Sequence, residues 1–146
     1  MQVEKIKNRL NRLQTEGKDT IGGLLRLELV ECDPQKQEYL LRGKTEPWMR
    51  NLTGTLHGGI CATLVDQAMG LVAYCSMPSE GIAPTIQMQV EYHRPLIPGE
   101  DVLILVRMVS VTRNLFRLSA EATLASAPDK VCLTSSATYF YKPFQA

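Results

Sequence analysis

Apolar residues recur at steps of three and four near the N-terminus, which predicts an amphipathic helix over residues 1–19. The apolar side of this helix carries Val3, Ile6, Leu10 and Leu13, and charged residues fill the other side. Such a charged side is typical of a solvated helix face. Gly17 and the pair Gly22-Gly23 should end the helix and open the first strand.

Two strands are predicted next, over residues 24–32 and 37–43, with the turn-forming dipeptide Asp33-Pro34 between them. The segment that follows, residues 44–55, contains Pro47 and Gly54 and shows no periodicity, which predicts a loop. Connections of this length often carry function.

Residues 58–76 form the most hydrophobic element of the chain. Apolar side chains point in almost every direction of a helix here, at Ile60, Leu64, Val65, Ala68, Met69, Leu71, Val72 and Tyr74. A helix without a polar face is a buried helix. We therefore expect residues 58–76 to be the central helix of the fold.

The rest of the chain alternates in the manner of strands. Ile86, Met88, Val90 and Tyr92 alternate with polar residues, as in a strand with one buried face. Further strands are expected over residues 102–106, 116–124 and 131–141, and turn signals at hairpin-like spacing favour antiparallel pairing. No internal repeat or domain boundary interrupts the pattern. The order of elements predicts one α+β domain over residues 1–146, in which an antiparallel sheet wraps around the central helix.

Composition and charge exclude several classes of protein. The 146 residues include 16 Lys and Arg against 15 Asp and Glu, and a net charge of +1 provides no field for nucleic acid or an acidic membrane surface. Two histidines, and four cysteines without C-x-x-C spacing, indicate neither a zinc site nor a redox dithiol. We expect no metal and no organic cofactor.

The sequence also carries no recognisable targeting segment. Charged residues between Glu4 and Arg12 interrupt the stretch where a signal peptide needs its apolar centre. The apolar run over residues 60–75 contains Asp66 and Gln67 and is too short to span a bilayer. We therefore expect a reduced, cytoplasmic protein that does not enter a membrane.

Asp66 is the first candidate for chemistry, because it is a carboxylate inside an otherwise apolar helix. A buried carboxylate is costly unless it is paired or used. Burial also disfavours the charged form, which suits a general base. The alternative is that Asp66 lies on an exposed edge of the helix or caps a loop.

The start of the same helix is the second candidate. Glycines at a helix N-terminus present backbone N–H groups without obstruction, and the helix dipole there favours developing negative charge, so Gly58 and Gly59 could form an oxyanion hole. In the alternative, the two glycines only allow the turn from loop to helix. By itself a residue such as His57 is more often a structural hydrogen-bonding group than a catalyst, and one such as Asn51 is more often a turn or cap residue.

These residues stand in one string, Asn51-x-x-Gly54-x-x-His57-Gly58-Gly59-x-x-x-x-x-x-Asp66. With the adjoining Gly54-Thr55-Leu56 and Ala62-Thr63-Leu64-Val65, the string resembles the hot-dog-fold acyl-CoA thioesterases of the phenylacetate-degradation and thioesterase-superfamily type. The resemblance covers residues 20–142. It implies a hot-dog fold, hydrolysis of an acyl-CoA thioester to free CoA and a carboxylic acid, and dimers that pair into tetramers.

The resemblance also implies a role for each residue of the motif. Asp66 would be the general base or the nucleophile, and the backbone N–H of Gly58 would polarise the thioester oxygen. Asn51 would orient the attacking water or Asp66, and His57 would support the loop and the thioester. Thr85 stands where relatives carry a Ser that helps to hold the water, and it keeps the hydroxyl group.

The match is incomplete around the substrate. One hot-dog branch has a hydroxyl residue one helical turn after its carboxylate, and this chain has Gly70 there. Gly59, Arg94 and Arg113 are predicted to bind the substrate, and Arg94, Arg113 and Lys130 are candidates for the nucleotide end of CoA. A surface charge is nevertheless the ordinary role of an Arg or Lys. The acyl group is left open by the sequence.

Two other functions remain as alternatives. A hot-dog hydratase or dehydratase usually carries an Asp five residues before its catalytic His, and here Leu52 precedes His57 and Met88 precedes His93 at that spacing. A non-catalytic acyl-CoA-binding protein is the other alternative. A DNA-binding regulator is disfavoured, because the segment before Gly17 is too short for a helix-turn-helix unit.

Helix geometry adds an expectation about assembly. Gly58 and Asp66 are eight residues apart, which is about 12 Å along a helix axis. Both must approach one thioester carbon, which is difficult for a single helix and possible for two antiparallel copies. A two-fold dimer is therefore expected, in which Asn51, His57 and Gly58 of one subunit serve Asp66 of the partner.

Overall fold

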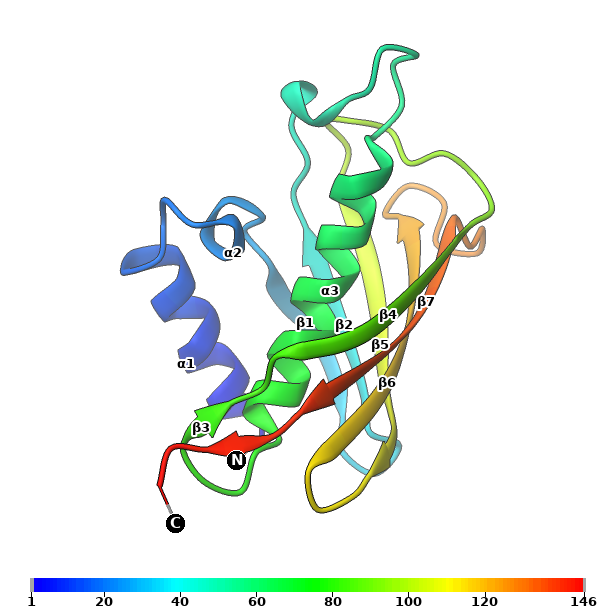
Figure 1. The fold of residues 1–146 in the computed structure, drawn as a ribbon. Coiled ribbons are helices and arrows are strands. Elements are labelled where there is room, and N and C mark those ends of the chain that lie inside the picture. The colour runs from blue at the N-terminus through cyan, green and yellow to red at the C-terminus, as the bar shows by residue number, and fades with distance from the viewer. Residues whose placement is uncertain (1, 146) are drawn as a thin grey trace.

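The computed structural model describes residues 2–145 and confirms the α+β fold with a central helix inside an antiparallel sheet (Figure 1). The elements in chain order are α1 (Gln2–Thr15), α2 (Ile21–Leu24), β1 (Glu28–Asp33), β2 (Glu38–Gly43), the 3₁₀ helix η1 (Pro47–Met49), α3 (Gly58–Cys75), β3 (Gly81–Ile82), β4 (Thr85–Tyr92), β5 (Val102–Val111), β6 (Leu115–Leu124), β7 (Leu133–Phe140) and β8 (Lys142–Pro143).

Six strands form one sheet in the order β1-β2-β5-β6-β7-β4, and all neighbouring pairs are antiparallel. The sheet curves around α3, and α1 lies beside α3 next to the β1 side (Figure 1). β3 and β8 form a separate pair of two residues each, which the sequence pattern did not predict. β4 and β1 are therefore the two edges of the main sheet.

α3 is the core helix that the sequence predicted. Nine of its residues are buried: Cys61, Leu64, Val65, Ala68, Met69, Leu71, Val72, Ala73 and Cys75. Its 18 residues have a mean hydropathy of 1.3, enough by length and composition to cross a membrane, and half of them are buried within the fold. A core helix meets the same criterion, and the packing of α3 against the sheet explains its hydrophobicity.

The N-terminal region differs from its expected course. α1 ends at Thr15, short of residue 19, and the first strand begins only at Glu28, after the additional helix α2. The Thr20 hydroxyl accepts a hydrogen bond from the Gly23 N–H and so caps α2. A Cβ atom on Gly23 would lie 2.1 Å from the carbonyl oxygen of Gly17, so this glycine is required where α2 touches the end of α1. The glycine pair thus belongs to a tightly packed helical turn rather than to the start of a strand.

β4 is less buried than its alternation predicts. Met88 and Val90 pack against the core, but Ile86 and Tyr92 on the same strand are 56% and 55% exposed. The reason is its place in the sheet, because β4 pairs with β7 on one side and has an open edge on the other. An open edge of this kind is a template for pairing with another chain.

Candidate functional site

Asp66 lies halfway along α3, half-buried, and two hydroxyl groups meet its carboxylate. The Thr85 hydroxyl at the start of β4 donates to Oδ1 over 2.8 Å. The Tyr139 hydroxyl on β7 lies 2.8 Å from the same Oδ1 and 3.0 Å from the backbone carbonyl oxygen of Asp66. Within residues 2–145 no donor reaches Oδ2, so this oxygen is available to a substrate or a water molecule.

Tyr139 is a site residue that sequence reasoning assigned only to the last strand. Its side chain is 1% exposed, and its pKa is raised, first by burial and then by the charge of Asp66. The phenol therefore stays protonated and acts as a donor. Gly70, one helical turn after Asp66, faces the Tyr139 ring, and a Cβ atom there would be in ordinary van der Waals contact with it at 3.4 Å. The buried position of a Tyr on β7 was the available signal, because a buried hydroxyl group needs a partner.

A cavity of about 460 Å³ opens beside Asp66. Besides Asp66 and Thr85, its walls combine the polar side chain of Gln67 with apolar side chains, among them Leu13, Leu71, Ile82 and Pro84. Arg9 of α1 also lines it and stacks on the Tyr74 ring, 4.0 Å from its centroid. The cavity can accept an apolar group whose reactive end reaches the carboxylate.

The N-terminus of α3 leaves the Gly58 N–H free within residues 2–145. His57 caps the helix, because its Nδ1 accepts the N–H of Gly59 over 2.9 Å. The Gly58 N–H, in contrast, makes no hydrogen bond within residues 2–145. The Tyr92 hydroxyl donates to the Gly58 carbonyl oxygen over 2.6 Å and holds this turn in place. Gly58 can therefore present its N–H to a developing negative charge, whereas the N–H of Gly59 is already used.

Asn51 organises its own loop. Its Oδ1 accepts hydrogen bonds from the backbone N–H groups of Thr53 and Thr55 and from the Thr53 hydroxyl, and its Nδ2 donates to the Thr55 hydroxyl. These bonds correspond to the turn and cap role that the sequence left open for Asn51. Within residues 2–145 no hydrogen bond joins Asn51 to Asp66.

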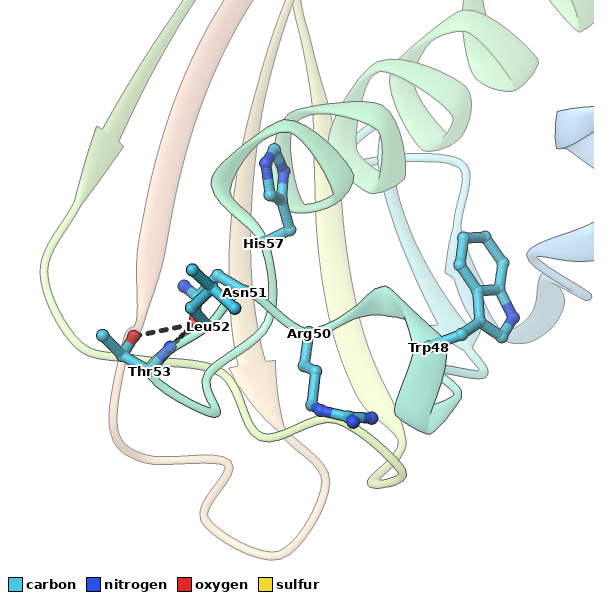
Figure 2. Close-up of a pocket in the computed structure, with 6 residues that line it drawn as sticks. All are labelled: Trp48, Arg50, Asn51, Leu52, Thr53 and His57. Carbon is cyan, nitrogen blue, oxygen red and sulfur yellow. Dashed lines mark hydrogen bonds between the residues drawn. The ribbon is translucent and has the colours of Figure 1, made fainter.

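The predicted site residues line three different cavities of the chain. Asp66 and Thr85 line the one described above. Asn51 and Gly58 line a second cavity of about 340 Å³. A third, open cavity of about 970 Å³ is formed by side chains of η1, of the following loop and of His57 at the start of α3 (Figure 2). Asp66 and the Gly58 end of α3 thus lie in different cavities of one chain.

The two predicted arginines also lie apart. Arg94 lines the cavity of Gly58 and donates from Nη1 to the carbonyl oxygen of Val131 over 2.9 Å. Arg113 lies in the tip between β5 and β6. The paired residues Gly43 and Val102 lie at the opposite end of β5, where the loop toward Asn51 begins. Within one chain, Arg113 is therefore remote from Gly58.

Comparisons with known proteins identify the family of this chain. The family model described as Thioesterase superfamily matches residues 53–131. Acyl-coenzyme A thioesterase 13 of Homo sapiens is 32% identical over 100 residues, which are 67% of this chain and 68% of the relative.

Two solved structures share the hot-dog fold of this chain. Zebra fish thioesterase superfamily member 2 is 24% identical with a TM-score of 0.76, over 92% of this chain and 97% of that one. The smu.793 protein of Streptococcus mutans UA159, solved bound to acetyl CoA, is 22% identical with a TM-score of 0.69, over 82% of this chain and 91% of that one.

Proposed function

The chain belongs to the thioesterase superfamily, and we propose that it hydrolyses acyl-CoA thioesters to free CoA and a carboxylic acid. The observation that carries the proposal is the Asp66 carboxylate, which two hydroxyl groups hold by one oxygen beside a cavity of about 460 Å³. The similarity to acyl-coenzyme A thioesterase 13 supports the choice of substrate class, and so does the neighbour solved with acetyl CoA.

The residues suggest a direct sequence of steps. The thioester oxygen accepts a hydrogen bond from the Gly58 N–H, which stabilises the negative charge that develops on it. Oδ2 of Asp66 takes a proton from a water molecule, and the resulting hydroxide attacks the thioester carbon. The tetrahedral intermediate then expels the CoA thiolate, which takes up the proton from Asp66. One water molecule is consumed, and a carboxylic acid and a thiol are released.

We propose further that each site is shared between two copies of the chain. The separation of Asp66 from Gly58 within one chain supports this assembly, because one substrate carbon must meet both. The open edge of β4, with Ile86 and Tyr92 exposed, offers a surface on which a second copy can pair. Pairing of such dimers into tetramers stays a prediction.

The direct test is the release of free thiol from a panel of short, medium, long and aromatic acyl-CoAs, followed with a thiol reagent. We expect turnover of at least one member. Tight binding of acyl-CoA without release of thiol would contradict the proposal and favour the non-catalytic acyl-CoA-binding protein.

We expect Tyr139→Phe to lower kcat by roughly tenfold, because the variant loses a hydrogen bond that fixes the Asp66 carboxylate.

Tyr141→Phe is the matched control for this prediction. Tyr141 is also a largely buried tyrosine, 7% exposed, but its hydroxyl bonds to Ser79. The control should keep the parental kcat. An unchanged kcat in Tyr139→Phe would remove Tyr139 from the positioning of Asp66.

Thiol alkylation under native conditions should leave turnover intact. Burial raises the pKa of Cys61 and of Cys75 to about 11, and the thiolate is the form that reacts. At pH 8 only about one thiol in a thousand is then ionised, and labelling should accelerate by roughly tenfold per pH unit as the pH rises toward 11. Mass spectrometry should find the half-buried Cys32 labelled first by iodoacetamide. Loss of activity in step with labelling of Cys61 would contradict this expectation.

A further inference from the structure

We propose that the open cavity around Trp48, Arg50 and His57 binds the adenosine 3′-phosphate 5′-diphosphate end of coenzyme A. This inference rests on the proposed function, since it assigns a subsite to the same substrate. None of the arginines or lysines considered from the sequence lies in this cavity.

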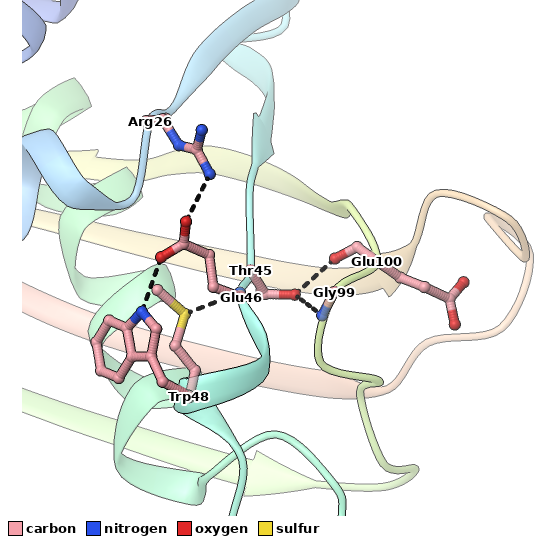
Figure 3. Close-up of polar contacts among 7 residues, drawn as sticks. Arg26, Thr45, Glu46, Trp48, Gly99 and Glu100 are labelled. Atoms are coloured by element: carbon pink, nitrogen blue, oxygen red, sulfur yellow. Dashed lines mark hydrogen bonds and ion pairs between the residues drawn. The ribbon is translucent and has the colours of Figure 1, made fainter.

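Trp48 is an exposed aromatic ring that is nevertheless held in place. Its side chain is 60% exposed, although an indole ring of this size is more often largely buried. The ring nitrogen donates to Oε2 of Glu46 over 2.7 Å, and Oε1 of Glu46 pairs with Arg26 over 3.2 Å (Figure 3). The ring is therefore a prepared stacking surface whose orientation is set before a ligand arrives.

The segment that carries Trp48 is anchored to the rest of the fold. Met49 of η1 is 2% exposed and packs in the hydrophobic core. The buried Thr45 hydroxyl donates to the carbonyl oxygen of Glu100 over 2.7 Å and accepts the N–H of Gly99 over 3.0 Å (Figure 3). These contacts tie η1 to the loop before β5. A rigid support of this kind favours a binding surface over a mobile loop.

The charges around the ring suit phosphate groups. Arg50 is exposed, its guanidinium donates to the carbonyl oxygen of Pro47 over 2.8 Å, and it makes no ion pair within residues 2–145. His57 uses Nδ1 as an acceptor, so its proton sits on Nε2, which is a donor without a partner in the described part of the chain. Among residues 2–145 no carboxylate lines the cavity, and the neighbouring Glu46 is paired with Arg26. An aromatic face with cationic and N–H donors is the combination that binds a base together with its phosphates.

The position of the cavity matches the order of groups in an acyl-CoA. The cavity shares Asn51 with the cavity of Gly58, where the thioester oxygen is proposed to bind. The pantetheine arm can therefore run from Gly58 past Asn51 to Trp48. The volume of about 970 Å³ lies within the range of cavities that hold ligands of this size.

Trp48 is the only tryptophan of the chain, so its fluorescence reports on this cavity alone. We expect CoA and adenosine 3′,5′-bisphosphate to change the emission with saturation, and pantetheine to leave it unchanged. An emission that responds to protein concentration and not to either nucleotide would mean that a second copy covers Trp48, and it would overturn the proposal.

Kinetics with two variants provide the second measurement. In Trp48→Ala and in Arg50→Gln, the preference for an acyl-CoA over the same acyl-pantetheine, measured as the ratio of kcat/KM, should fall by roughly tenfold. Arg12→Gln is the charge-matched control, because Arg12 is an exposed residue of α1 that pairs with Glu16. An unchanged ratio together with parental turnover of acyl-pantetheine would overturn the subsite and leave the proposed hydrolysis standing. The absence of turnover with every thioester would overturn the hydrolysis.

A misfolded variant would lose activity toward both substrates together, and its ratio would not change. In that case the fluorescence titration of the parent protein decides whether the subsite exists.

Discussion

Asp66→Asn is expected to lower kcat for acyl-CoA hydrolysis by about 10²–10⁴, the usual contribution of a general base. The amide has nearly the shape of the carboxylate, and its oxygen can still accept from Thr85 and Tyr139, so the fold should persist. It cannot, however, take a proton from water. Thiol release gives the turnover, and competition by a non-hydrolysable acyl-CoA analogue shows whether binding survives.

Asp129→Asn is the matched control, because Asp129 lies exposed in a turn between β6 and β7. It should retain parental turnover and parental thermal stability. Activity of Asp66→Asn within threefold of the parent would remove Asp66 from the mechanism.

Mixed dimers of two inactive variants should regain activity if sites are shared. Asn51→Ala loses the bonds that shape the loop before Gly58, and Asp66→Ala loses the proposed base. In a dimer of one chain of each kind, one site carries both defects and the other carries none. Random exchange makes half of the dimers mixed, so about a quarter of the parental activity should return if the sites act independently.

Subunit exchange has to be established by native mass spectrometry before the result is interpreted. With exchange shown, the absence of any recovery would mean that each site is built within a single chain. Each variant incubated alone under the same conditions provides the baseline.

The elements that local pattern determines were predictable. α3 is apolar on nearly every side, and β6 and β7 alternate, so their existence and type follow from the periodicity alone. α2 was not predictable in this way, because two glycines in succession favour a turn, and the contact of Gly23 with Gly17 is not visible in a local window.

The exposure of β4 shows a second limit of prediction from the sequence. Alternation tells which residues share a face, but not whether another element covers it. Ile86 and Tyr92 share the apolar side of the strand and remain exposed, because β4 is at the edge of the sheet.

A site residue could be predicted from the sequence only where its type at that position, or the family resemblance, already suggested a chemical role. Asp66 was identified because a carboxylate in an apolar helix requires an explanation, and Thr85 followed from the family resemblance; the structure brings these two together. Tyr139 was missed because its partner is 73 residues away, and strand pairing rather than local pattern joins them.

The hydrogen bond between Tyr139 and Asp66 also determines when the site can form during folding. It connects the middle of the chain to one of its last strands, and Thr85 is held opposite Tyr139 by the pairing of β4 with β7. Contacts between such distant positions form late, since a long loop must close before they contribute. During synthesis, β4 has no partner strand until residues 133–140 have left the ribosome. The carboxylate therefore gains its two donors only when the chain is nearly finished, and a nascent chain ending before β7 would carry the motif from Asn51 to Asp66 without a working site.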